Sequence, residues 1–197
     1  MSVGRLAARA VIGGLFVGHG TQKLFGWFGG PGRAGTEGMM ESLQMRPAKV
    51  HAALAGVTET ACGGMLVLGL GTPLATAGLT GVMTTAIRKV HLPNGPWAAN
   101  GGWEYNAVLI AAVTSLAETG PGRLSLDYLR GRERKGIHWA LFSLATGVGA
   151  AALTMAAGER SAPALAPQPV IQPVPDVADI AGDPTTAGAS DPTTAGS

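Results

Sequence analysis

The stretch VHAALAGVTETACGGMLVLGL, residues 50–70, carries a single charged side chain, that of Glu59. A helix of about 17–25 residues crosses the roughly 30 Å hydrocarbon core of a bilayer. This run is therefore long and apolar enough to form a transmembrane helix. Residues 137–157 form a second such run, which contains no Asp, Glu, Lys or Arg. These two runs indicate a membrane protein, so the rest of the chain is read for further membrane-spanning helices.

Three further runs also have the length and apolar character of membrane spans, although they are shorter or more polar: residues 6–25, 74–90 and 104–118. Over its 197 residues the chain is 46% hydrophobic and 13% charged, about half the roughly 25% charge of a soluble domain. Its four tryptophans and two tyrosines fall at the edges of apolar runs, where membrane-interface anchors are expected. The composition predicts an all-α integral membrane helical bundle within residues 1–158. The expected spans are about 6–25, 50–70, 74–90, 104–118 and 137–157.

The first run raises the alternative of a secretory signal peptide, because Arg5 and Arg9 precede a short apolar stretch. No small-x-small cleavage pattern follows Gly18, and the chain continues through polar residues that a helix tolerates. We therefore interpret residues 6–25 as a span. The next connection is long and predicts a short interfacial helix at residues 36–43, whereas the tight turn at residues 69–73 predicts antiparallel neighbours.

Residues 159–197 differ sharply from the bundle. They hold seven of the thirteen prolines, and the sequence DPTTAG occurs at residues 183–188 and again at 191–196. They also carry five acidic groups and one basic group, so the bundle alone has a net charge of +6. This composition predicts a disordered, Pro-rich acidic tail that acts as a spacer. Because the basic residues lie between apolar runs, no nucleic-acid partner is expected.

Ionisable residues inside membrane spans are costly and mark candidate sites. An up-and-down bundle places six of them in the same half of the bilayer: His19, Lys23, His51, Glu59, His91 and Glu104. Glu59 has a depth similar to His19, which predicts an ion pair or hydrogen bond from Glu59 to His19 or Lys23. Such a pair can serve catalysis, with His19 and Glu59 as the candidates, or it can equally serve only to join two helices.

Several cofactors are compatible with these side chains to different degrees. A haem held by His19 with His51 or His91 is disfavoured, because His19 lies deeper in the bundle than either partner. Quinone or proton chemistry requires less rigid geometry and stays open, so no cofactor is assigned. The single cysteine, Cys62, excludes an intramolecular disulfide and a multi-cysteine metal site, and no metal site is expected.

Glycines recur on two of the expected spans. Gly13 and Gly20 lie on the first, and Gly56, Gly63 and Gly64 on the second. Small residues let membrane helices approach closely. We therefore expect these two helices to pack backbone against backbone.

Several strings taken in order resemble the DoxX family of bacterial integral membrane proteins. They are Arg9-x3-Gly13, residues 16–30 with His19-Gly20-x2-Lys23, Glu59 before Gly63-Gly64, His91 before Asn94-Gly95, Gly101-Gly102-x-Glu104-Tyr105, and residues 120–127. The resemblance implies a four-helix transmembrane core in the cytoplasmic membrane, to which this chain adds a fifth transmembrane helix and the tail. The family's polar signature falls on Arg9, His19, Lys23, Glu59, His91, Glu104, Arg123 and Asp127.

The resemblance also implies a class of function. DoxX proteins are linked to membrane redox complexes with soluble partners, and related DoxD-type proteins to thiosulfate:quinone oxidoreduction. The expectation is a membrane subunit of a redox or oxidative-stress-linked complex that anchors soluble oxidoreductase partners and contacts quinone; whether the chain itself catalyses a reaction stays open. The alternatives are a small-molecule or proton-coupled transporter that uses the His/Glu/Lys cluster, and a purely structural scaffold.

Basic residues are equally numerous on the two predicted sides of the membrane, so their number alone sets no orientation. The densest short basic loop is residues 130–135. Cytoplasmic loops are enriched in Lys and Arg. We therefore expect a cytoplasmic N-terminus and an extracytoplasmic C-terminal tail.

Overall fold

The computed structural model describes residues 3–161, which are helical and contain no strand. The α-helices are α1 (Val3–Phe25), α2 (Gly32–Ser42), α3 (Ala48–Leu68), α4 (Thr72–Ala86), α5 (Glu104–Thr119), α6 (Leu126–Leu129) and α7 (Ile137–Arg160). A π-helical turn, Ile87–His91, extends α4. The expected tail lies outside the described residues except at its start, where the prediction is wrong: Glu159 and Arg160 still belong to α7.

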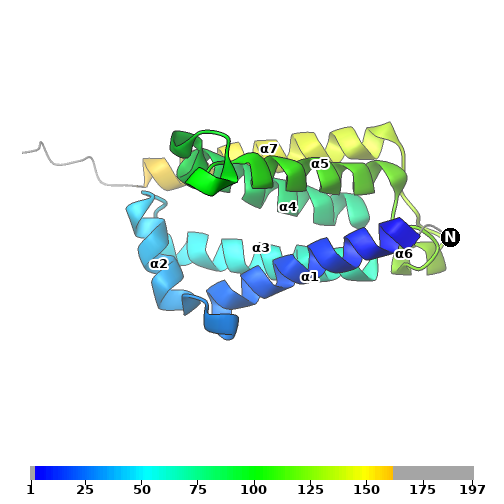
Figure 1. Ribbon diagram of the computed structural model, residues 1–197, viewed down its shortest axis with the longest axis horizontal. Coiled ribbons are helices and arrows are strands. Elements are labelled where there is room, and N and C mark those ends of the chain that lie inside the picture. The colour runs from blue at the N-terminus through cyan, green and yellow to red at the C-terminus, as the bar shows by residue number, and fades with distance from the viewer. Residues whose placement is uncertain (1–2, 162–197) are drawn as a thin grey trace, which may run out of the picture. The chain divides into compact units, whose positions relative to one another are not determined.

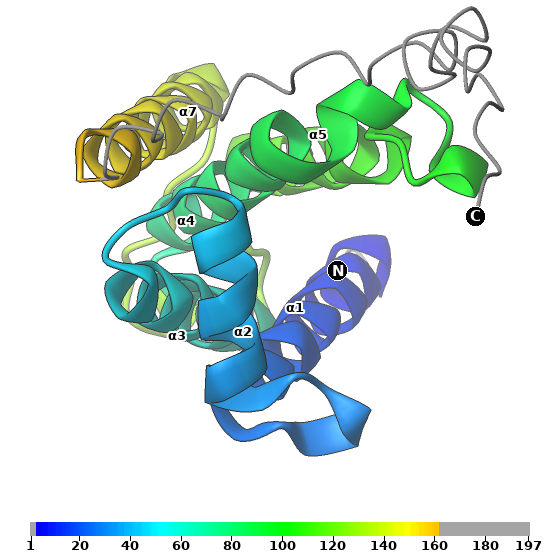
Figure 2. The same ribbon diagram turned by 90° about the vertical axis from the view of Figure 1, so that its left-hand side faces the viewer.

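Five long helices run alternately up and down the long axis of the bundle (Figure 1). Helices α1 and α3 pack on one another, and α4 packs against α3, α5 and α7. The short helix α2 lies across the end of the bundle, between α1 and α3 (Figure 2). The structure thus confirms the expected short helix at residues 36–43, which begins earlier, at Gly32.

Helices α1 and α3 meet through their backbones. A Cβ atom added to Gly13 would lie 2.6 Å from the carbonyl oxygen of Gly63, and one added to Gly63 would lie 2.7 Å from that of Gly13. Gly20 and Gly56 are similarly crowded, whereas Gly64 has open space beside it. The predicted close approach is therefore confirmed for four glycines and wrong for Gly64, which lies on a different face of α3.

Replacing Gly63 with alanine should force α1 and α3 apart. Overpacking a close interface commonly costs about 1–3 kcal/mol, and we expect a loss of this size in the free energy of unfolding in detergent. Gly64→Ala is the matched control on the same helix. It should be neutral or slightly stabilising, because alanine favours a helix over glycine by about 0.5–1 kcal/mol. Equal losses in the two variants would contradict this contact.

Helix α4 is the most buried element of the bundle. Its threonines Thr72, Thr76 and Thr80 are fully buried. The Thr76 and Ser143 hydroxyls lie 2.7 Å apart in a hydrogen bond that joins α4 to α7. Leu79 contributes to the main apolar core together with residues of α1, α3 and α5.

Within residues 3–161, two helices, α3 and α7, are both long enough and apolar enough to cross a membrane. Helix α1 has sufficient length but carries Arg5, Arg9 and Lys23. Helices α4 and α5 are apolar, but their α-helical parts have 15 and 16 residues. All five expected runs are helical, and the two strongest runs in the sequence are the two that satisfy both criteria.

Candidate functional site

A cleft of about 810 Å³ lies among the helices. Side chains of α1 and α3 form one wall and those of α4 and α5 the other, and the cleft extends along α4 to α7. Most lining residues are apolar, among them Ile12, Phe16, Met65 and Leu109. Ligand sites are commonly concave, mainly apolar and about 300–1,000 Å³ in volume, with a few polar groups that orient the ligand.

The expected ion pair is present in the wall of this cleft. Lys23 Nζ of α1 donates to Glu59 Oε2 of α3 at 2.7 Å. The Glu59 side chain is 3% exposed and that of Lys23 is 20% exposed, so the carboxylate is enclosed while the ammonium group faces the cleft. The two side chains meet because of where they lie along their helices. Lys23 lies in the last turn of α1, and Gly20 and Gly56 let the backbones of α1 and α3 approach closely there.

The histidines of the predicted cluster line the same cleft without contacting one another through hydrogen bonds. His19 is exposed and bonds to Gln22, one turn along α1, at 3.1 Å. His51 is buried near the end of α7, with Nε2 3.2 Å from the carbonyl oxygen of Arg46. His91 Nδ1 lies 2.7 Å from the carbonyl oxygen of Gly101. The predicted partner of Glu59 is thus Lys23 rather than His19.

Glu104 has a local role in the loop that precedes α5. Its Oε1 accepts a hydrogen bond from the backbone N–H of Ala98 at 2.9 Å. Its neighbours Tyr105 and Asn106 line the cleft, whereas Glu104 does not. Glu104 and His91 together therefore fix the fold of residues 91–104 at the rim of the cleft.

Arg9 lies at the opposite end of α1 and contacts backbone rather than the cleft. The side chain is 1% exposed. Its guanidinium donates to four carbonyl oxygens, those of Leu66 (3.0 Å), Val67 (2.7 Å), Pro121 (2.5 Å) and Leu124 (3.0 Å). Positive charge at the C-terminus of a helix is favourable, and Arg9 caps α3 in this sense.

Asp127 completes that end of the bundle. Its carboxylate accepts the backbone N–H groups of Gly71 at 2.9 Å and Thr72 at 3.2 Å, at the N-terminus of α4. Arg123, which is four residues before Asp127, is exposed. The eight signature positions thus separate into a cleft group (His19, Lys23, Glu59 and His91), the loop residue Glu104, a capping pair (Arg9 and Asp127) and a surface residue (Arg123).

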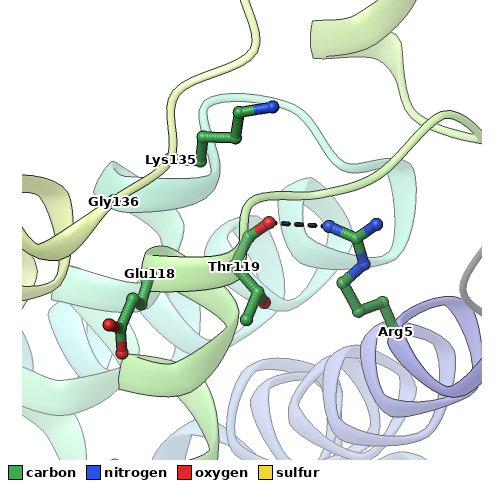
Figure 3. A pocket seen from close by; sticks show the side chains of 5 residues that line it. All are labelled: Arg5, Glu118, Thr119, Lys135 and Gly136. Carbon is green, nitrogen blue, oxygen red and sulfur yellow. Dashed lines mark hydrogen bonds between the residues drawn. The ribbon is translucent and has the colours of Figure 1, made fainter.

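A smaller pocket of about 650 Å³ lies between the starts of α1 and α7 and the end of α5 (Figure 3). Arg5 donates from Nη1 to the carbonyl oxygen of Thr119 at 2.6 Å. The carboxylate of Glu118 points away from Arg5 (Figure 3). The Arg5 bond therefore ties the start of α1 to the end of α5, and the pocket is open to its surroundings.

Sequence reasoning missed Asn106 as a cleft residue. Its side chain is 6% exposed, and Nδ2 lies 3.3 Å from Met83 Sδ. An amide two residues inside an apolar run is a signal that could have identified it. Met39, Met40 and Met45 also line the cleft, and thioether side chains adapt readily to different apolar ligands.

The cleft presents a cation with uncommitted donors to an apolar cavity. After its bond to Glu59, the Lys23 ammonium retains N–H groups that can donate to a carbonyl or hydroxyl oxygen. Among residues 3–161, no group of three or more His, Cys, Asp or Glu side chains gathers closely enough to hold a metal ion. The arrangement suits an amphipathic molecule whose polar head carries hydrogen-bond acceptors.

Comparison with known proteins identifies the first half of the bundle. No curated protein and no solved structure matches the chain. The family model described as DoxX matches residues 4–92, a range that includes Arg9, His19, Lys23, Glu59 and His91. The other three signature positions, Glu104, Arg123 and Asp127, lie beyond the match. The match supports membership of the DoxX family for residues 4–92 of this chain.

Proposed function

We propose that this protein is a multi-pass protein of the cytoplasmic membrane. Large apolar side chains are exposed on every long helix, including Val11 on α1, Val57 on α3, Val108 on α5 and Leu153 on α7. Large apolar side chains exposed on so many helices are consistent with contact with lipid chains. The basic loop at residues 130–135 supports a cytoplasmic N-terminus. Because five spans place the two ends of the chain on opposite sides of the membrane, the C-terminal tail is then extracytoplasmic.

Within the membrane, we propose that the protein is a subunit of a redox or oxidative-stress-linked complex, to which it anchors soluble oxidoreductase partners. The observation that supports a contact with a redox-active ligand is the Lys23–Glu59 pair in the wall of the apolar cleft. The chemistry of a quinone suits this site, because its carbonyl oxygens can accept hydrogen bonds from Lys23 and its ring can pack against apolar side chains. When bound, the quinone supplies the electron-carrying chemistry, while the protein binds and orients it.

Purification from its native membrane in a mild detergent tests the assembly. We expect a redox enzyme to copurify, together with bound quinone in the organic extract. Recovery of the chain alone under every gentle condition would contradict the redox assembly. Substrate flux by the purified chain in proteoliposomes would then favour the transporter alternative, which uses the same cleft.

Glu59→Gln tests the site itself. The amide retains the size of the side chain and an oxygen that can accept from Lys23, but it removes the negative charge. A neutral acceptor holds the Lys23 ammonium less firmly than a carboxylate does, so the donor for the quinone is less well positioned. We expect at least a tenfold weaker affinity for a short-chain quinone, about 1.4 kcal/mol, measured by titration of the purified complex. Glu118→Gln is the matched control, because Glu118 is exposed and lies outside the cleft. Equal affinities in both variants would leave the pair as a purely structural link.

A further inference from the structure

Helices α1 and α5 stand apart over most of their length. They are tied at one end by the Arg5–Thr119 hydrogen bond (Figure 3), and among residues 3–161 no other hydrogen bond joins them. Figures 1 and 2 both show the ribbons of the two helices apart, with α3 and α4 between them. Residues of both helices line the cleft, which is partly open to its surroundings, and we call its side between α1 and α5 the opening.

The two sides of the opening are apolar. On α1, Ile12 and Leu15 line the cleft, and the adjacent Val11 is 60% exposed on the outer surface. On α5, Leu109 lines the cleft, and the adjacent Val108 is 63% exposed. In a bundle that spans the bilayer, such a surface faces hydrocarbon, so the opening faces lipid chains rather than water.

Polar groups gather toward one end of the cleft. Lys23 and Glu59 lie near the end of α1, about three helical turns beyond Ile12. A molecule with one polar head and a long apolar tail matches this gradient. A head placed at Lys23 would leave the tail beside Ile12 and Leu109.

We propose that the cleft takes its ligand sideways from the bilayer, through the opening between α1 and α5, and that the ligand is a quinone with a long apolar tail. This inference rests on the quinone contact in the proposed function and adds the route of entry and the site of the tail. Lys23 binds the head, and Ile12 and Leu109 flank the tail.

Cys62 provides a built-in reporter for this route. It is the single cysteine of the chain, it is partly buried, and it lines the cleft one helical turn from Glu59. The full chain is reconstituted in sealed lipid vesicles and treated with a long-chain alkyl maleimide or with a membrane-impermeant charged maleimide, applied to both faces. We expect the alkyl reagent to label Cys62 roughly tenfold faster, because it partitions into the bilayer beside the opening.

Tryptophan at a cleft-facing position narrows the route, and tryptophan at the neighbouring outer position does not. Leu109→Trp should slow labelling by the alkyl reagent roughly tenfold, because the larger ring fills the passage. Val108→Trp is the matched control and should label like the parent chain. Circular dichroism and unfolding in detergent establish that both variants are folded.

The outcomes separate the route from the ligand. Faster labelling by the charged reagent, or equal rates in Leu109→Trp and Val108→Trp, would overturn entry from the bilayer. Protection of Cys62 by a decyl-substituted quinone, but not by decanoate or decanol at equal concentration, would support the quinone assignment. Equal protection by all three would overturn the quinone as ligand, whereas the redox assembly is tested separately by copurification.

Discussion

Replacing Arg9 with methionine is expected to lower the free energy of unfolding by about 3–5 kcal/mol, because the buried guanidinium holds four backbone carbonyl oxygens at once. Hydrogen bonds to a charged group contribute roughly 1.5–3 kcal/mol each, and relaxation of the surrounding loop recovers part of the loss. Methionine has a similar length, so the change removes donors and charge without opening a large cavity.

The measurement is reversible unfolding of the purified chain in mixed micelles, followed by helical circular dichroism. Arg123→Met is the matched control, because Arg123 is exposed on the same end of the bundle. It should change the free energy of unfolding by no more than about 0.5 kcal/mol. If both variants unfold at the same denaturant concentration, the Arg9 network does not hold this end together.

The second large effect concerns the Lys23–Glu59 pair. Lys23→Met and Glu59→Met should each cost about 3 kcal/mol, because each leaves one charge in the largely apolar cleft wall without its partner. The double variant removes both charges and should be less destabilised than either single variant. The expected coupling, obtained from a double-mutant cycle in the same unfolding assay, is therefore about 3 kcal/mol or more.

A second lysine–glutamate pair supplies the control. Lys89 Nζ lies 2.7 Å from Glu159 Oε1, the same distance as in the enclosed pair, but the Glu159 side chain is 60% exposed. Exposed ion pairs contribute roughly 0–1 kcal/mol. The same methionine cycle at Lys89 and Glu159 should give much weaker coupling than the cycle at Lys23 and Glu59. Similar coupling energies for both pairs would mean that the burial of Glu59 does not strengthen its interaction with Lys23.

The helices and the helix–helix contacts were predictable from sequence because they depend on regular spacing. Apolar runs placed all five long helices, and the depth of Glu59 in its run placed it beside the end of α1. The glycines predicted the α1–α3 contact for the same reason. The prediction for Gly64 was wrong because a glycine only allows close approach on its face of a helix and does not show that another helix packs there.

The separation of the polar signature into groups with different roles was not predictable. Arg9 and Asp127 act on the ends of α3 and α4 through the irregular segment at residues 120–127. No periodicity places such a loop beneath helices that are 50 or more residues earlier in the chain. Glu104 shows the same limit, because its partner is a backbone N–H in a loop whose path depends on several glycines.

The Arg9 network also constrains the order in which the molecule assembles. Synthesis from the N-terminus produces Arg9 57 residues before Leu66 and 115 before Leu124, so its acceptors appear late. Until then an unpaired guanidinium on α1 is costly to place in hydrocarbon. Helix α1 is thus expected to settle fully only after α5 and residues 120–124 have been synthesised, so this end of the bundle closes after the first four long helices exist.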